Sequence, residues 1–129
     1  MKIAVIIVRI LLGALFLFAS ITFLFNVFPK PELTGPLKTF NEGMDATGYL
    51  MHLVKVIELI CGIAFITGRF VPLAAVVIFP IVVNIVGVHM FLAPEGLPTA
   101  IFVLAATLFL AYAYRNYYKG LLVSKATLS

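Results

Sequence analysis

The stretch IAVIIVRILLGALFLFASITFLFNVF, residues 3–28, decides the fold class of this chain. Its only charged residue is Arg9, and the run exceeds the about 20 apolar residues with which a helix crosses a bilayer. A cleaved signal peptide has an apolar core of about 7–15 residues, so we interpret this segment as an uncleaved first membrane span. The two prolines of Pro29-Lys30-Pro31 prevent the helix from continuing further.

Composition indicates that lipid is the solvent for the whole chain. Of the 129 residues, 64% are hydrophobic and 11% are charged, and the mean hydropathy is +1.20. So few charges cannot provide the solvated surface that a soluble domain needs. The basic residues form no cluster or stripe, so we expect no nucleic-acid partner. The sequence also lacks metal-ligand spacings, phosphate-binding loops and nucleophile triads.

Three further apolar segments complete the predicted fold. Pro72 and Pro98 each stand where a helix can begin, since a missing N–H costs nothing in the first turn. The short connections between the segments force neighbouring helices to run antiparallel. We predict an all-α membrane protein, a single transmembrane domain over residues 1–129 that forms a four-transmembrane-helix up-down-up-down bundle. The predicted helices cover about residues 3–28, 46–67, 71–92 and 98–118, and an external loop covers residues 29–45 and folds back in part over the bundle mouth.

The charges of the connecting segments orient the bundle. One side carries only basic residues, namely Lys2, Arg69, Arg115, Lys119 and Lys125. The other side carries both signs, namely Lys30, Lys38, Glu32, Glu42, Asp45 and Glu95. By the positive-inside rule we predict that both termini are cytoplasmic, in a multi-pass protein of the cell inner (plasma) membrane.

Six polar side chains interrupt the predicted spans: Arg9, His52, Lys55, Glu58, Asn84 and His89. An ionisable group in hydrocarbon costs ~3 kcal/mol or more, so each needs a partner, a snorkelling route or water. A rise of 1.5 Å per residue places Arg9 at ~9 Å and Glu58 at ~15 Å from the cytoplasmic ends of their helices. An extended arginine closes that difference, so we predict an Arg9–Glu58 pair. Lys55 shares a helix face with Glu58 and is left as an uncompensated charge.

We therefore predict a ligand-binding or buried polar site formed by Arg9, Lys55, Glu58 and Asn84, with His52 and His89 as secondary candidates. Two interpretations stay open: a structural set in which Lys55 snorkels outward, or a partly wet pocket that opens outward and holds a polar or anionic head group. A haem held by the two histidines is not favoured, because nothing else in the sequence supports one. No catalytic residue and no metal site is assigned.

The order and spacing of several motifs resemble the DoxX family of small four-helix bacterial membrane proteins. The resemblance extends along nearly the whole chain and rests on Val8-Arg9-Ile10-Leu11-Leu12-Gly13, Lys55-Val56-Ile57-Glu58-Leu59-Ile60-Cys61-Gly62, Gly68-Arg69-Phe70-Val71-Pro72-Leu73, Asn84 with His89, and Phe91-Leu92-Ala93-Pro94-Glu95-Gly96-Leu97-Pro98. It implies a small membrane subunit such as that of a thiosulfate:quinone oxidoreductase, a role in redox or oxidative-stress assemblies, or an assembly factor. Cys61 is the only cysteine in the sequence, so the chain cannot carry out thiol–disulfide chemistry without a thiol from another molecule.

The leading functional hypothesis is an accessory or anchoring subunit of a membrane redox, quinone-linked assembly, without independent catalytic activity. Its ligand would be a quinone or lipid, and its partners the lipid bilayer and a membrane redox protein. A small transporter or permeability protein is one alternative, and a structural or assembly factor without its own chemistry is the other. Small residues such as Gly13 and Ser20 permit close helix approach within the chain or in a homo-oligomer.

Overall fold

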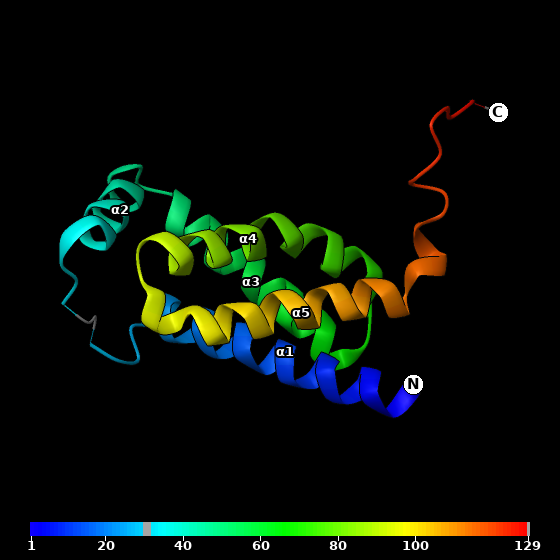
Figure 1. Ribbon diagram of the computed structural model, residues 1–129, viewed down its shortest axis with the longest axis horizontal. Helices are drawn as coiled ribbons and strands as arrows, with labels where there is room; N and C mark the ends of the chain where they lie inside the picture. The colour runs from blue at the N-terminus through cyan, green and yellow to red at the C-terminus, as the bar shows by residue number, and fades with distance from the viewer. Residues whose placement is uncertain (30–31, 129) are drawn as a thin grey trace.

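The computed structural model describes residues 1–29 and 32–128, and these residues form four long helices with a shorter fifth at one end (Figure 1). The long helices are α1 (Lys2–Leu24), α3 (Leu50–Thr67), α4 (Val71–Phe91) and α5 (Leu97–Ala113). The short helix α2 (Gly35–Ala46) joins α1 to α3, and the 3₁₀ turns η1 (Pro94–Gly96) and η2 (Arg115–Tyr118) flank α5. Four segments are long and apolar enough to cross a membrane: Lys2–Leu24, Leu50–Thr67, Val71–Phe91 and Pro94–Ala113. The chain is therefore an all-helical membrane protein, as predicted.

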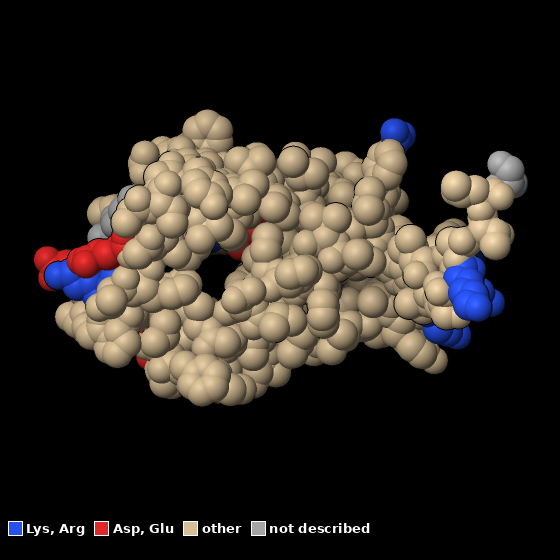
Figure 2. Space-filling view, turned by 90° about the horizontal axis from the view of Figure 1, so that it is seen from above, with Lys and Arg blue, Asp and Glu red and all other residues tan. Residues whose placement is uncertain are grey.

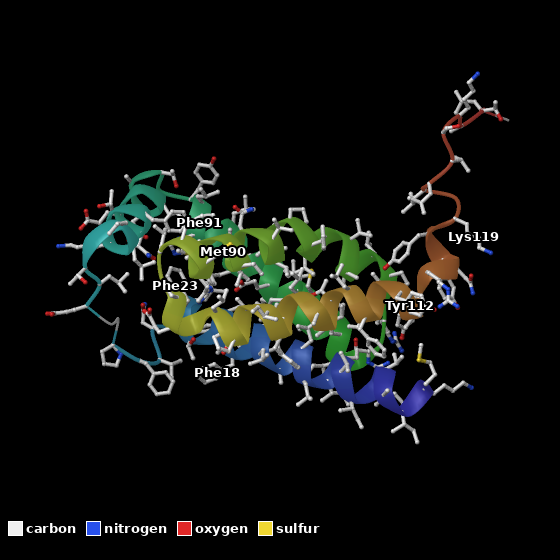
Figure 3. The ribbon with its side chains drawn as sticks, viewed as in Figure 1. Phe18, Phe23, Met90, Phe91, Tyr112 and Lys119 are labelled. Carbon is white, nitrogen blue, oxygen red and sulfur yellow. The ribbon has the colours of Figure 1, made fainter. Side chains whose placement is uncertain are left out.

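The two ends of the bundle differ in what they carry. Figure 1 shows both chain termini at one end, here called the termini end, and α2 at the other, here called the α2 end. Figure 3 shows Phe23 and Met90 toward the α2 end and Tyr112 and Lys119 toward the termini end. On the face drawn in Figure 2, basic side chains gather alone at the termini end, whereas both signs of charge meet at the α2 end. The two ends therefore present different electrostatic surfaces.

The expected external loop over residues 29–45 is wrong in one respect, because most of it is the helix α2. Pro36 stands in its first turn, where a proline favours helix formation. The apolar Leu37, Phe40 and Met44 recur at helical spacing, so one face of α2 can turn toward the bundle. The loop composition, rich in glycine and charge, masked this periodicity. Lys30 and Pro31, which the prediction used to end the first span, lie outside the described residues.

The spans are also shorter than predicted. Helix α1 ends at Leu24 instead of residue 28, since Asn26 adopts a left-handed backbone with φ of 50°. Helix α3 begins at Leu50 instead of residue 46, after Gly48 with φ of 79°. Helix α5 ends at Ala113, and the residues up to 118 continue as a 3₁₀ turn. At the end of α1 and at the start of α3, a positive φ therefore places the helix boundary inside the predicted span.

The tightly packed core lies toward the termini end. Leu12, Phe65, Ile78 and Leu110 are fully buried there, one from each span. Helices α1 and α3 approach closely because glycines face each other. A Cβ added to Gly13 would lie 2.9 Å from the carbonyl oxygen of Gly62. Small residues at such crossings let backbones touch, and in lipid this packing is a main source of helix association.

The bundle opens toward the α2 end. Among the described residues, α1 has no buried residue after Ser20, α3 has none before Glu58, and α4 has none after Val82. Figure 2 shows the surface hollowed in this half, with a basic and an acidic side chain at the wall of the hollow. Three of the four spans thus have no buried residue in this half of the described chain, here called the open half, whereas α5 keeps Ala100 buried. The other half is here called the closed half, and the open half holds the candidate site.

Candidate functional site

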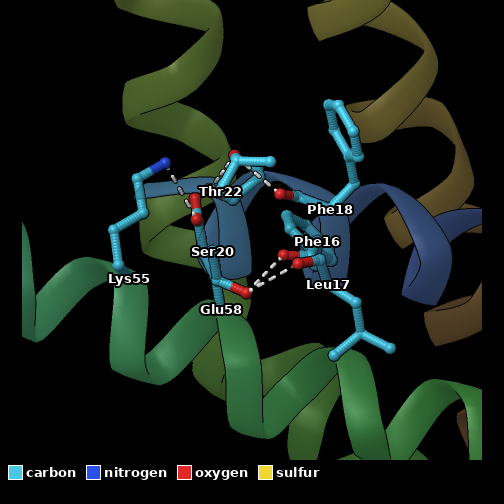
Figure 4. A network of polar contacts seen from close by, with 8 residues as sticks. Phe16, Leu17, Phe18, Ser20, Thr22, Lys55 and Glu58 are labelled. Carbon is cyan, nitrogen blue, oxygen red and sulfur yellow. Dashed lines mark hydrogen bonds and ion pairs between the residues drawn. The ribbon is translucent and has the colours of Figure 1, made fainter. Parts of the chain in front are cut away.

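Lys55 and Glu58 form an ion pair within α3. They lie three residues apart on one face of the helix, and Lys55 Nζ is 3.1 Å from Glu58 Oε2 (Figure 4). The Glu58 side chain is 4% exposed and the Lys55 side chain 19% exposed. Glu58 is therefore the deep member of the pair, and Lys55 connects it to the surface.

Glu58 faces α1 at the level of Ser20. Gly62 packs on Gly13 and Leu17, and Arg9 packs on Gly68, so residue numbers on α1 and α3 run in opposite directions. One helical turn from Gly62 toward the α2 end places Glu58 opposite Ser20, as Figure 4 shows.

Lys55 is the residue that compensates the negative charge of Glu58. The hydroxyl of Ser20 is committed to its own helix, where it donates to the carbonyl of Phe16 at 2.7 Å. Glu58 Oε2 is buried and receives no aligned hydrogen bond from the described residues. Lys55 Nζ is close to that oxygen but not in hydrogen-bond alignment with it, so their attraction is that of an ion pair.

An aromatic layer covers the pair on the side of the α2 end. Lys55 Nζ lies 5.9 Å from the centre of the Phe23 ring, within the range of a cation–π contact. The Phe23 ring in turn meets His52 edge-on, with ring centres 5.6 Å apart. Lys55, Phe23 and His52 therefore bring α1 and α3 together just above Glu58.

A cavity of about 710 Å³ lies between α2 and the open ends of α1 and α3. Its lining carries charges of both signs, aromatic and amide groups, and apolar side chains. The lining residues are Phe23, Glu32, Leu33, Thr34, Lys38, Asn41, Glu42, Asp45, Met51 and Lys55. Lys55 belongs both to this lining and to the pair with Glu58, so the buried carboxylate is one side chain away from the cavity.

The predicted Arg9–Glu58 pair is wrong. No ion pair joins these residues among those that the structure describes, and Glu58 is paired with Lys55 instead. The prediction counted depth from helix ends assumed to be level. In the structure α1 extends past the end of α3, because Arg9 lies beside Gly68, the C-cap of α3. Arg9 and Ser20 are therefore ~16 Å apart along α1, beyond the reach of one side chain to Glu58.

Asn84 and His89 are bound to their own helix, away from the ion pair. The amide of Asn84 is exposed, and its Nδ2 donates to the carbonyl of Pro80 at 2.9 Å. His89 Nδ1 lies 2.8 Å from the carbonyl of Ile85, and its ring packs on Gly96 so closely that a side chain there would collide with it. Of the predicted set, the structure brings together Lys55 and Glu58, with His52 nearby.

Sequence reasoning missed Phe23, Ser20 and the lining that α2 contributes. Phe23 and Ser20 are uncharged residues in an apolar stretch of α1, so nothing in the sequence distinguished them as site residues. The acidic residues of α2 were visible only as loop charges used for orientation. Their helical spacing, with Lys38 and Glu42 four apart and their charged groups 3.8 Å from each other, was the signal that could have placed them on one surface.

Cys61 belongs to the apolar core of the bundle. Cys61 is buried, with its sulfur 3.7 Å from the carbonyl of Ala74. Within residues 1–29 and 32–128, no group of three or more His, Cys, Asp or Glu side chains is arranged to hold a metal ion.

These features define a class: a small four-span membrane protein with a buried ion pair beneath a cavity at one end. The model of the DoxX family matches residues 4–90, which cover α1 to nearly the end of α4. The chain belongs to the DoxX family, in agreement with the resemblance seen in its sequence. No curated protein and no solved structure matches it.

Proposed function

We propose that this DoxX-family protein is an accessory or anchoring subunit of a quinone-linked redox assembly, and that it binds a quinone or lipid-like ligand in the cavity above Lys55. One observation carries the proposal. Lys55 lies at the boundary between the cavity and the buried Glu58, so a charged donor is held at the inner wall of a space of about 710 Å³. Ligand sites are usually clefts of about 300–1,000 Å³ with a few placed polar groups.

The chemistry of the cavity fits a quinone head group. A quinone offers carbonyl oxygens as acceptors on a flat ring. Lys55 Nζ is a donor, and the ring of Phe23 beside it is a flat apolar surface. Because the buried Glu58 carboxylate attracts the ammonium group of Lys55, this group stays at the inner wall of the cavity when no ligand is present. The apolar tail of such a ligand would lie along the open half of the spans.

The sealed end of the bundle argues against transport through one copy of the chain. Leu12, Phe65 and Leu110 are each 0% exposed, so they close the path from the cavity toward the termini end. A purely structural role is also less favoured. The ion pair lies within one helix, and a pair at i and i+3 cannot by itself fix the register between helices.

The proposal includes an orientation and a location. The bundle is up-down-up-down in the plasma membrane, both termini are cytoplasmic, and α2 with its cavity faces the outside. The support is the purely basic composition of the segments at the termini end. A cysteine at Thr39 on α2, labelled in intact cells by a membrane-impermeant maleimide, tests this. A cysteine at Ser124 is the control that must stay unlabelled until the cells are opened, and the reverse pattern contradicts the orientation.

Quinone binding is tested by thermal unfolding of the purified protein in lipid nanodiscs, with and without a short-chain ubiquinone. A ligand at 100 times its Kd stabilises a protein by about 2.7 kcal/mol, so the unfolding temperature should rise by several degrees. We expect Lys55→Met to lose this rise, whereas Lys119→Met, with the same charge change at the termini end, keeps it. No quinone effect on the unmodified chain, or an equal effect on Lys55→Met, contradicts the proposal.

The accessory role is tested separately, by affinity purification from native membranes. We expect a redox protein to co-purify with the unmodified chain and with Lys119→Met. If only lipids co-purify after mild cross-linking, the chain acts alone and the accessory role is wrong.

A further inference from the structure

Arg9 lies inside a membrane-spanning helix and has no hydrogen-bond acceptor or ion-pair partner among residues 1–29 and 32–128. It lies in the second turn of α1, half-buried, and its Nε is buried without a hydrogen-bond partner among the described residues. Neither does its guanidinium form an ion pair with any residue in the described ranges. Arginine keeps its charge at all working pH values and has five N–H donors. A group of this kind in an apolar surrounding needs a partner, water or an acceptor from outside the chain.

Arg115, at the same end of the bundle, has both a hydrogen-bond acceptor and an aromatic contact for its guanidinium. Its Nη1 donates to the carbonyl of Tyr112 at 2.9 Å, and its guanidinium lies 4.2 Å from the centre of the Tyr112 ring. The buried Nε of Arg9 has no such carbonyl within the described part of the chain. The two arginines at this end therefore differ in their surroundings, and those of Arg9 leave its Nε without an acceptor among the described residues.

A cavity of about 300 Å³ opens beside Arg9, between the start of α1 and the end of α5. Its wall combines two cations, a phenol and apolar side chains. The lining residues are Met1, Lys2, Val5, Ile6, Arg9, Ala113 and Tyr114. Lys2 is exposed at the mouth of the cavity and Arg9 lies deeper, so the positive charge continues from the surface inward. An acceptor that enters from the membrane surface meets Lys2 first and Arg9 second.

Gly68 holds the arginine in place. The guanidinium packs directly on this glycine, and a Cβ there would lie 2.7 Å from Arg9 Nη1. Gly68 also adopts a left-handed backbone with φ of 75°, which favours glycine. The turn between α3 and α4 thus leaves room for a flat guanidinium and limits where it can turn.

No acidic residue is available at this end to act as counter-ion. The segments around the termini end carry Lys2, Arg69, Arg115, Lys119 and Lys125 and no Asp or Glu. Arg9 is ~10 Å along α1 from Lys2, near the level at which lipid phosphates meet the acyl chains if the helix starts at the surface. A phosphate offers paired oxygens that match the two-pronged guanidinium.

We infer that the cavity between α1 and α5 binds a phosphate group through Arg9 and Lys2, with the Tyr114 side chain beside it. The shared chemistry is that of a phosphate group in a molecule with net negative charge, which an anionic phospholipid supplies in the membrane and inorganic phosphate supplies in solution. This site lies at the end opposite to the proposed quinone cavity. It stands or fails independently of that proposal.

The test is native mass spectrometry of the full chain released from micelles that contain phosphatidylglycerol and phosphatidylcholine in equal amounts. We expect phosphatidylglycerol to remain bound in preference to phosphatidylcholine, and Arg9→Gln to reduce that preference at least about fivefold. Arg115→Gln removes the same charge from the same end and is expected to keep the preference. A second arm adds inorganic phosphate in millimolar excess. Retention of the lipid assigns the site to a lipid phosphate, and displacement assigns it to free phosphate.

Other outcomes overturn the inference. An unmodified chain without preference for the anionic lipid contradicts it, and so does an equal loss in Arg9→Gln and Arg115→Gln. If Arg9→Gln fails to fold, Arg9→Lys and Lys2→Gln replace it. Arg9→Lys keeps the charge without the fork, so a full preference in both replacement variants is equally contrary to a site built on Arg9 and Lys2.

Discussion

The termini half and the α2 half of the bundle are formed by the same four spans, but the first is tightly packed and the second contains a large cavity. In the termini half, glycines bring α1 and α3 into contact, and Phe65 is fully buried. In the α2 half, the last buried residues of α1 and α3 are Ser20 and Glu58, beyond which lies a cavity of about 710 Å³. The contacts between α1 and α3 and the fully buried side chains are therefore concentrated in the termini half. This leaves the other half free to hold a charged pair beside an open space.

The largest expected effect breaks the closed half. Phe65→Ala removes a fully buried ring that stacks on Phe16 with centres 6.2 Å apart. We expect the free energy of unfolding to fall by about 3 kcal/mol, at the lower limit for Phe→Ala, since in lipid the loss comes from packing more than from transfer out of water. Unfolding in mixed micelles with increasing denaturing detergent measures it. Ile60→Ala, at a side chain 61% exposed, is the control and should change stability little.

The second prediction tests the close approach of α1 and α3. A Cβ at Gly13 would lie 2.7 Å from Ile66 Cγ1 and 2.9 Å from a backbone oxygen, so Gly13→Ala must push the helices apart. We expect a loss of about 1–3 kcal/mol in the same unfolding assay. Gly87→Ala is the matched control, because a Cβ there meets nothing within 4 Å. Equal effects of the two substitutions would show that helix propensity, and not the crossing, sets the result.

The third prediction concerns the open half and its ion pair. Lys55→Met leaves the buried carboxylate of Glu58 without a counter-charge. We expect a loss of about 1–2 kcal/mol, below the about 3–5 kcal/mol of a fully buried pair, because the Lys55 side chain is 19% exposed beside the cavity. Glu58→Gln should cost less, because the ammonium of Lys55 can still turn toward the cavity that it lines. The double variant should be more stable than the sum of the two losses implies. A purely additive double variant contradicts a direct interaction between the two groups.

The smallest expected effect lies at the termini end, outside the spans. The hydroxyl of Tyr118 donates to the carbonyl of Pro72 at 2.8 Å, and Tyr118→Phe should cost about 1 kcal/mol. Tyr117→Phe, at a side chain 74% exposed, is the control. Burial raises the pKa of Tyr118 above its ordinary value of 10.0, so the folded state keeps the proton that the unfolded state loses. The stability that this adds is complete below about pH 10 and lost as pH rises through the raised value, and Tyr118→Phe should remove this part of the pH dependence.

Sequence periodicity and composition predicted the number of spans, because a run of apolar residues has one stable form in lipid. The starts of α4 and α5 near Pro72 and Pro98 were also predicted, since a proline marks a first helical turn. The C-terminal end of α1 and the existence of α2 were not predicted. They depend on the backbone at Asn26 and on a helix whose glycines and charges are typical of a loop.

The site was predicted in part for a related reason. Lys55 and Glu58 lie on one helix, and their spacing alone places them together. Arg9 was paired with the wrong partner, because the relative shift of α1 and α3 is a tertiary property. That shift is fixed by the contact of Gly13 with Gly62, which no count along one helix reveals. Asn84 was placed by depth, but depth does not determine which face of α4 a side chain occupies.

A photoreactive quinone tests most directly whether the α2 half holds a ligand cavity at Lys55. The full chain in nanodiscs is irradiated with an azido-ubiquinone, and modified residues are located by peptide mass spectrometry. We predict adducts around Phe23 and Met51, both in the cavity lining, and their loss when excess unlabelled quinone is added. Adducts spread over lipid-facing residues such as Ile60 and Val76, without competition, would contradict it.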